Sequence, residues 1–185
     1  MVILILAEPR TGSSNLTTWF SMNKDFTTLF LPSNINSKWY TKEFPYKYKT
    51  KHLLIKEDFH SGLDFENLFK ISEKVIYLYR ENEELQIESW LHAQKTKNWH
   101  GFWTNKEIYY DEEGKNSFQN LKKEFKKFYE KRNGFIISYE ELYYRNGISK
   151  LIEYVDIPEL KELTFPIGKK YRIEIKNEFT SNHLI

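Results

Sequence analysis

Four short apolar runs stand out along the chain, at residues 2–7, 53–55, 74–79 and 135–139. Apart from Lys74 and Ser138 they are apolar, and they do not alternate with polar residues as a half-exposed strand does. Such runs are typical of strands that are covered on both faces of a sheet. The sequence therefore predicts four buried strands, of which residues 74–79, closed by Arg80, form the clearest.

The segments between these runs carry apolar residues at helical spacing. A short helix is expected after residues 9–14, and further helices are expected around residues 65–72, 83–96, 118–128 and 148–155, the last capped by Asn146. Residues 21–50 predict no regular element. Because strands and helices alternate, we expect an α/β three-layer sandwich, with a central parallel sheet and helices on both faces. Ligands of such sheets bind at the carboxyl ends of the strands.

Composition narrows the class of protein. The 185 residues fit one domain, spanning 1–185, and the 17% aromatic content argues against disorder. A net charge of +2 does not favour nucleic-acid binding. No apolar run approaches the ~20 residues of a membrane span, and we interpret the opening run as a strand rather than a signal peptide. The absence of Cys excludes thiol chemistry and fits a cytoplasmic location.

The turn after the first predicted strand has the chemistry of an anion site. Its polar residues are Arg10, Thr11, Gly12, Ser13, Ser14 and Asn15. Gly12 permits a tight turn, and the amides and hydroxyls at the start of the next helix are donors that favour phosphate or sulfate. Arg10 adds a permanent charge. The alternative is an ordinary serine-capped helix. The G-x-x-x-x-G-K-[ST] motif of nucleotide kinases is absent.

Residues 9–14 (PRTGSS) resemble the phosphosulfate-binding loop P-[KR]-[ST]-G-[ST]-[ST] of the sulfotransferases that use 3′-phosphoadenylyl sulfate (PAPS). The resemblance implies a P-loop NTPase-like strand–loop–helix. It also implies that Arg10 contacts the bridging oxygen and the sulfuryl group, while Ser13 and Ser14 bind the 5′-phosphate. Many cytosolic members place a Trp after the hydroxyl pair to stack on adenine. This chain has Asn15 there, with Trp19 one turn later, so the stacking residue stays open.

A second group of residues strengthens the resemblance. Strand 74–79 ends at Arg80, and Ser89 follows in the next predicted helix, as do the arginine and serine that bind the 3′-phosphate in this family. The fuller string through Gln86, Ala93 and Thr96 is most similar to the trehalose-type bacterial branch. The alternative is a surface arginine and a solvent-facing serine.

Two further segments match the family. Residues 138–142 (SYEEL) resemble a structural segment, to which we assign no chemistry. The tail resembles one that folds over the nucleotide, and there Lys169 and Lys170 would contact the 3′-phosphate.

The general base is less clearly indicated. Asp58 matches the position of the family's histidine, whereas His60, two residues further on, carries an imidazole, which titrates near neutral pH. Glu43 is a third candidate, because some branches use a carboxylate from that region. An exposed acidic turn without catalytic function is the alternative for all three.

These features predict a PAPS-dependent sulfotransferase that acts on a hydroxyl of a carbohydrate or small metabolite. No metal is expected, because the 5 His show no ligand spacing. Aromatic residues such as Trp39, Tyr40, Tyr46 and Trp103 are candidates for a sugar-stacking surface, but core packing explains them equally well. A small nucleotide kinase and a non-catalytic nucleotide-binding relative are the alternatives, and the oligomeric state stays open.

Overall fold

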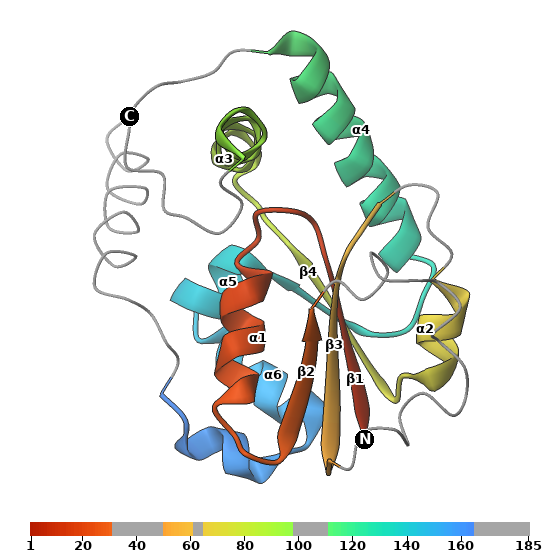
Figure 1. Cartoon of the computed structure of the whole chain (residues 1–185), viewed down its shortest axis with the longest axis vertical. Coiled ribbons are helices and arrows are strands. Elements are labelled where there is room, and N and C mark those ends of the chain that lie inside the picture. Colours follow the sequence, from red (N-terminus) through yellow and green to blue (C-terminus); the bar gives the residue numbers. More distant parts are fainter. Residues whose placement is uncertain (31–49, 61–64, 98–110, 165–185) are drawn as a thin grey trace.

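The computed structural model describes residues 1–30, 50–60, 65–97 and 111–164, and its centre is a sheet of five parallel strands (Figure 1). The strand order is β2-β3-β1-β4-β5. The strands are β1 (Val2–Ala7), β2 (Phe26–Phe30), β3 (His52–Asp58), β4 (Lys74–Tyr79) and β5 (Phe135–Ser138). All six residues of β1 are buried, as expected for the central strand of a covered parallel sheet.

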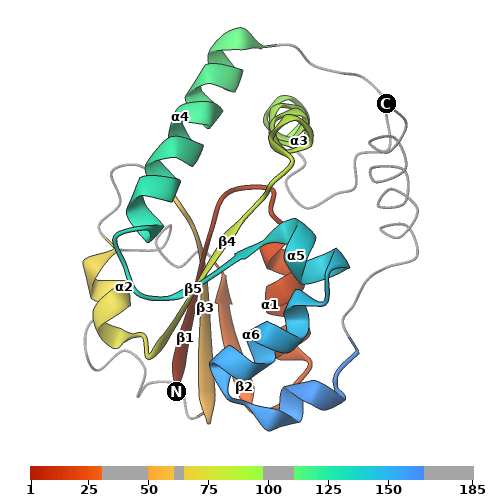
Figure 2. The same ribbon diagram turned by 180° about the vertical axis from the view of Figure 1, so that it is seen from behind.

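Helices cover both faces of this sheet (Figures 1 and 2). One face carries α1 (Ser13–Ser21), α5 (Tyr139–Tyr144) and α6 (Gly147–Val155), while the other carries α2 (Glu66–Ile71) and α4 (Glu112–Tyr129). The remaining helix, α3 (Glu83–Thr96), lies beyond the carboxyl ends of the strands, and a 3₁₀ helix (Pro158–Glu162) follows α6. None of the described helices combines the length and the apolar character of a membrane span. The expected α/β sandwich is confirmed.

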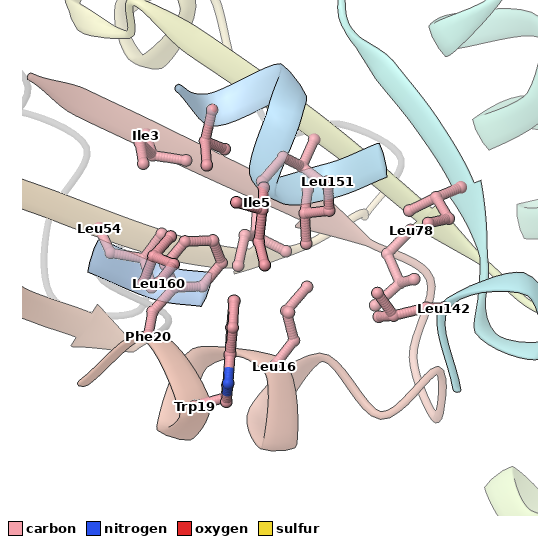
Figure 3. Packing of buried hydrophobic residues seen from close by; sticks show 14 of the residues in the cluster. Ile3, Ile5, Leu16, Trp19, Phe20, Leu54, Leu78, Leu142, Leu151 and Leu160 are labelled. Atoms are coloured by element: carbon pink, nitrogen blue, oxygen red, sulfur yellow. The ribbon is translucent and has the colours of Figure 1, made fainter. Parts of the chain in front are cut away.

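The two faces of β1 belong to two separate hydrophobic clusters, as strand alternation requires. Ile3 and Ile5 pack with α1 and α6, whereas Leu4 and Leu6 pack against α2 and α4. Trp19 lies inside the first cluster, fully buried, with its ring 5.0 Å from that of Phe20 (Figure 3). Trp19 is therefore not accessible to a ligand, so it cannot stack on adenine.

The structure corrects the expectation at the outer strands. Residues 26–30 form edge strand β2 inside the segment that predicted no regular element. Its consecutive threonines Thr27 and Thr28 break the apolar pattern, and only Phe26 is buried among residues 26–29. The opposite edge strand, β5, is not fully buried, because the side chain of Ile136 is 43% exposed. Strand β2 therefore has no apolar run that would mark it as a strand, whereas β5 was predicted because all but one of its residues are apolar.

Two strand boundaries and one helix cap also differ from the prediction. Strand β3 continues past Ile55 through the charged residues 56–58, whose side chains are largely buried. Tyr139 begins helix α5 rather than ending β5. Asn146 occupies the N-cap position of α6, but with φ 59° its side chain caps no backbone N–H and instead accepts a hydrogen bond from the Ser149 hydroxyl at 3.1 Å.

At the amino end of β3, His52 is buried against Phe26, with ring centroids 5.0 Å apart. Neither ring nitrogen has a hydrogen-bond partner within the described part of the chain. Burial lowers the pKa of His52 below its ordinary value of 6.5, and the positive charges of the N-terminal amino group and Lys51 act in the same direction, against smaller opposing effects of Asp25 and Glu159. The folded state thus favours the neutral imidazole.

We predict that this histidine makes the fold less stable in mild acid. In the unfolded chain His52 takes up a proton as the pH falls through 6.5, whereas the folded chain resists protonation until lower pH. The free energy of unfolding should therefore fall between about pH 7.5 and about pH 5.5 more steeply in the wild type than in His52→Phe. Urea denaturation at several pH values measures this difference, and equal slopes for the two proteins would contradict it.

Candidate functional site

The carboxyl ends of β1, β3 and β4 lie side by side at one edge of the sheet, because β1 pairs in parallel with both neighbours. Ala7 is paired with Asp58 on one side and with Leu78 on the other. The chain leaves β1 toward α1 on one face and leaves β3 toward α2 on the opposite face. In open α/β sheets, ligands bind where neighbouring connections diverge in this way.

The turn between β1 and α1 depends on a glycine. Gly12 is the N-cap residue of α1 with φ 72°, a conformation that L side chains rarely adopt. A Cβ at this position would lie 3.0 Å from the ring of Tyr139 and 3.1 Å from the Tyr143 hydroxyl. That hydroxyl donates a 2.8 Å hydrogen bond to the Gly12 carbonyl oxygen. Helix α5 therefore packs directly on the turn and fixes its shape.

The hydroxyl-bearing residues of the turn differ in what they can offer a ligand. The Thr11 side chain is fully buried, and its hydroxyl donates to the Glu8 carbonyl oxygen at 2.8 Å. Ser13 is buried and Ser14 and Asn15 are partly exposed, all three in the first turn of α1, which contains no acidic residue. The positive end of the helix dipole therefore faces outward here without a neutralising carboxylate from its own turn.

Arg10 joins this turn to the next strand–helix connection. Its Nε donates a 2.8 Å hydrogen bond to the hydroxyl oxygen of Ser89, which lies on α3, 79 residues further along the chain. Arg10 itself has φ 65°, a left-handed backbone conformation that residues other than glycine rarely adopt. Two of the predicted ligand-binding groups, one from each segment, thus lie at a single place.

Arg80, at the end of β4, lies on the α5 side of the same edge. Its guanidinium stands 4.9 Å from the centre of the Tyr139 ring, and its Nε is 3.8 Å from a carboxylate oxygen of Glu140. The side chain is only 11% exposed. Glu140 also accepts hydrogen bonds from the backbone N–H groups of Glu81 and Asn82, at 2.8 and 3.0 Å. The start of α5 therefore holds both the Arg80 side chain and the turn that follows it.

Tyr139 is a site residue that the sequence reasoning missed. Its ring contacts the Gly12 position on one strand–helix turn and the Arg80 guanidinium on another. The segment 138–142 was expected to be only structural. A signal was nevertheless present, because Tyr139 directly follows the β5 strand, at the edge where the other polar residues gather.

A buried polar network beneath the turn was also missed. The Lys122 ammonium lies 3.2 Å from a Glu8 carboxylate oxygen and 2.6 Å from the side-chain oxygen of Gln86. The Gln86 amide nitrogen donates to Glu8 at 3.1 Å and to the Pro9 carbonyl oxygen at 2.8 Å. Burial raises the pKa of Glu8, and the nearby charge of Lys122 and the hydrogen bonds oppose that rise. Nothing in the spacing of these residues reveals the network.

The candidates for the general base differ in their surroundings. Asp58, at the end of β3, is held by Lys56, whose ammonium lies 2.6 Å from a carboxylate oxygen. Lys56 is almost fully buried, while the Asp58 side chain is 20% exposed. Both lie on the face that carries α1, since they alternate with Ile55, which belongs to the opposite cluster. His60 is exposed two residues beyond the strand.

Several predicted residues lie outside the described part of the chain. These are Glu43, Lys169 and Lys170, together with the aromatic residues Trp39, Tyr40, Tyr46 and Trp103. Within the described ranges, no group of three or more His, Asp or Glu residues is placed to hold a metal ion.

Comparison with known proteins supports the fold. No protein-family model matches the sequence, and no curated protein matches it. Among solved structures, the chain is similar to mouse sulfotransferase SULT7A1, determined in complex with PAP, with a TM-score of 0.52 and 16% identity. The match covers 94% of this chain and 62% of that one, so this chain spans less than two thirds of its structural neighbour. The chain therefore shares the α/β fold of that sulfotransferase, as predicted, and the trehalose-type branch stays a prediction.

Proposed function

We propose that the protein is a PAPS-dependent sulfotransferase that transfers a sulfuryl group to a hydroxyl of a carbohydrate or small metabolite. The observation that carries this proposal is the 2.8 Å contact between Arg10 and Ser89. One of these residues belongs to the turn that resembles a 5′-phosphosulfate loop and the other to the segment that resembles a 3′-phosphate site. Two adjacent segments of this kind would suit a nucleotide that carries one anionic group at the 5′ position and another at the 3′ position of its ribose.

The nucleotide would lie along the carboxyl edge of β1 and β4. The amides of Gly12, Ser13 and Ser14 and the two serine hydroxyls would hold the 5′-phosphate, with the Thr11 amide and Asn15 beside them. Arg80 and Ser89 would bind the 3′-phosphate, and Lys169 and Lys170 would close over it. Because Arg80 is fixed by Tyr139 and Glu140, little side-chain entropy remains to be lost on binding.

The residues at this site would supply the groups that sulfuryl transfer needs. The acceptor oxygen attacks sulfur in line as the bond from sulfur to the 5′-phosphate oxygen breaks, and the acceptor proton passes to a base. Arg10 would stabilise the charge that develops on the leaving oxygen. Asp58 would take the proton from a position fixed by Lys56, with His60 as the other candidate. The whole chain, residues 1–185, would act as one domain.

Ligand-induced stabilisation tests the proposal. Saturating PAP should raise the Tm of the wild type by about 5 °C, because a ligand that binds only the folded state stabilises it, whereas ATP with Mg²⁺ should give a much smaller shift. In Arg80→Ala the PAP shift should fall to that of adenosine 5′-phosphate, which lacks the 3′-phosphate. The matched control is Arg145→Ala, which removes an exposed arginine paired with Glu81 on the same side of the fold.

Selective stabilisation by ATP with Mg²⁺ would instead indicate a nucleotide kinase. Equal losses of the PAP and adenosine 5′-phosphate shifts in Arg80→Ala would contradict the role proposed for Arg80. PAP binding without sulfuryl transfer to any acceptor would indicate a non-catalytic relative.

We also predict that the base acts on turnover and not on nucleotide binding. Asp58→Asn keeps a hydrogen-bonding oxygen near Lys56 but removes the proton acceptor, so kcat should fall by about 10²–10⁴-fold while PAP affinity changes little. His60→Gln tests the other candidate in the same way. Sulfuryl-transfer kinetics with PAPS measure both, with Glu159→Gln, at the opposite end of the sheet, as the control. Unchanged turnover in both variants would rule them out and leave Glu43 as the remaining candidate.

A further inference from the structure

Lys122 is a largely buried lysine of α4. Its side chain is 13% exposed, whereas that of Lys126, one turn later, is 66% exposed. The helix is anchored to the fold by buried Phe118, Phe125 and Tyr129, so its packing does not require a buried cation. Moving an ammonium out of water has a desolvation cost that even good hydrogen bonds often only offset, so stability alone does not account for a lysine at this position.

All three hydrogens of the Lys122 ammonium have an acceptor. They are directed to the Glu8 carboxylate at 3.2 Å, the backbone carbonyl oxygen of Arg80 at 2.9 Å and the Gln86 side-chain oxygen at 2.6 Å. An ammonium has three donors, so this side chain is saturated.

The three acceptors belong to three different parts of the site. Glu8 begins the turn that carries Arg10, the Arg80 carbonyl ends β4, and Gln86 lies on α3 one turn before Ser89. The network closes on itself, because Glu8 also accepts from the Arg80 backbone N–H at 3.3 Å and from Gln86. Lys122 therefore joins the backbone segments that carry Arg10, Arg80 and Ser89.

We propose that Lys122 is a positioning residue that sets the spacing between the two anion-binding groups, so that one bisphosphorylated nucleotide engages both. This inference rests on the proposed function. When two binding groups act on a single ligand, their joint affinity depends on their separation, whereas the affinity for a ligand that meets only one group does not. Lys122 contributes to the binding of PAP without touching it.

The test compares Lys122→Met with the exposed control Lys126→Met. Calorimetric titration gives the affinity of each protein for PAP and for adenosine 5′-phosphate. Lys122→Met should lower the ratio of the PAP affinity to the adenosine 5′-phosphate affinity by about tenfold. The reason is that only PAP depends on the separation between the two anion-binding groups, which the substitution disturbs. Lys126→Met should leave the ratio unchanged. A purely structural role for Lys122 would lower the free energy of unfolding and leave the ratio at the wild-type value.

A double variant, Glu8→Gln with Lys122→Met, covers the case in which Lys122→Met does not fold. Removing Lys122 alone leaves the buried Glu8 carboxylate without its cation, and the second change relieves this cost. The double variant should regain stability but keep the lowered ratio. A fall of about threefold or more in a folded variant supports the inference, and a smaller fall overturns it. If the wild type itself binds PAP no better than adenosine 5′-phosphate, the proposed function fails, whatever Lys122 does.

Discussion

The hydrogen bond between Arg10 and Ser89 is the contact on which the rest of the site depends. It exists because β1 lies directly beside β4 in a parallel sheet, so that the segments after both strands leave the same edge. Segments nearly eighty residues apart in sequence are thereby brought within hydrogen-bonding distance. Gly12, Tyr143 and the network around Glu8 then fix the conformation of the turn from which Arg10 extends.

Much of the fold follows from local patterns. Strands β1 and β4 and helix α3 were predicted with their observed limits, because the central strands are mostly apolar and residues 83–96 carry apolar side chains at helical spacing. The structure adds that the Asn82 side chain caps α3. Strand β2 was missed because its two central threonines interrupt the apolar run that marks the other strands. The charged end of β3 was missed for a different reason. Lys56 and Asp58 neutralise each other at the site, so residues that usually end a strand continue it.

The candidate site, like the fold, could be predicted from the sequence only in part. Arg10, Gly12, Ser13, Ser14, Arg80 and Ser89 were predicted as ligand-binding residues because a short motif and a strand end mark them. Lys122 and Glu140 lie on elements that the topology, not the sequence spacing, brings to the edge of the sheet. Helix α4 contains several solvent-exposed lysines, so the sequence does not show which of its lysines is buried. Only the three-dimensional arrangement distinguishes Lys122 from its neighbours.

The central claim is that the turn after β1 and the end of β4 bind opposite ends of one nucleotide. Calorimetric titration of the wild type with PAP, adenosine 5′-phosphate and adenosine 3′-phosphate tests it most directly. If both groups engage one molecule, PAP should bind at least about a hundredfold more tightly than either monophosphate, because the second contact is then intramolecular. An affinity for PAP no greater than that for the better monophosphate would contradict the account.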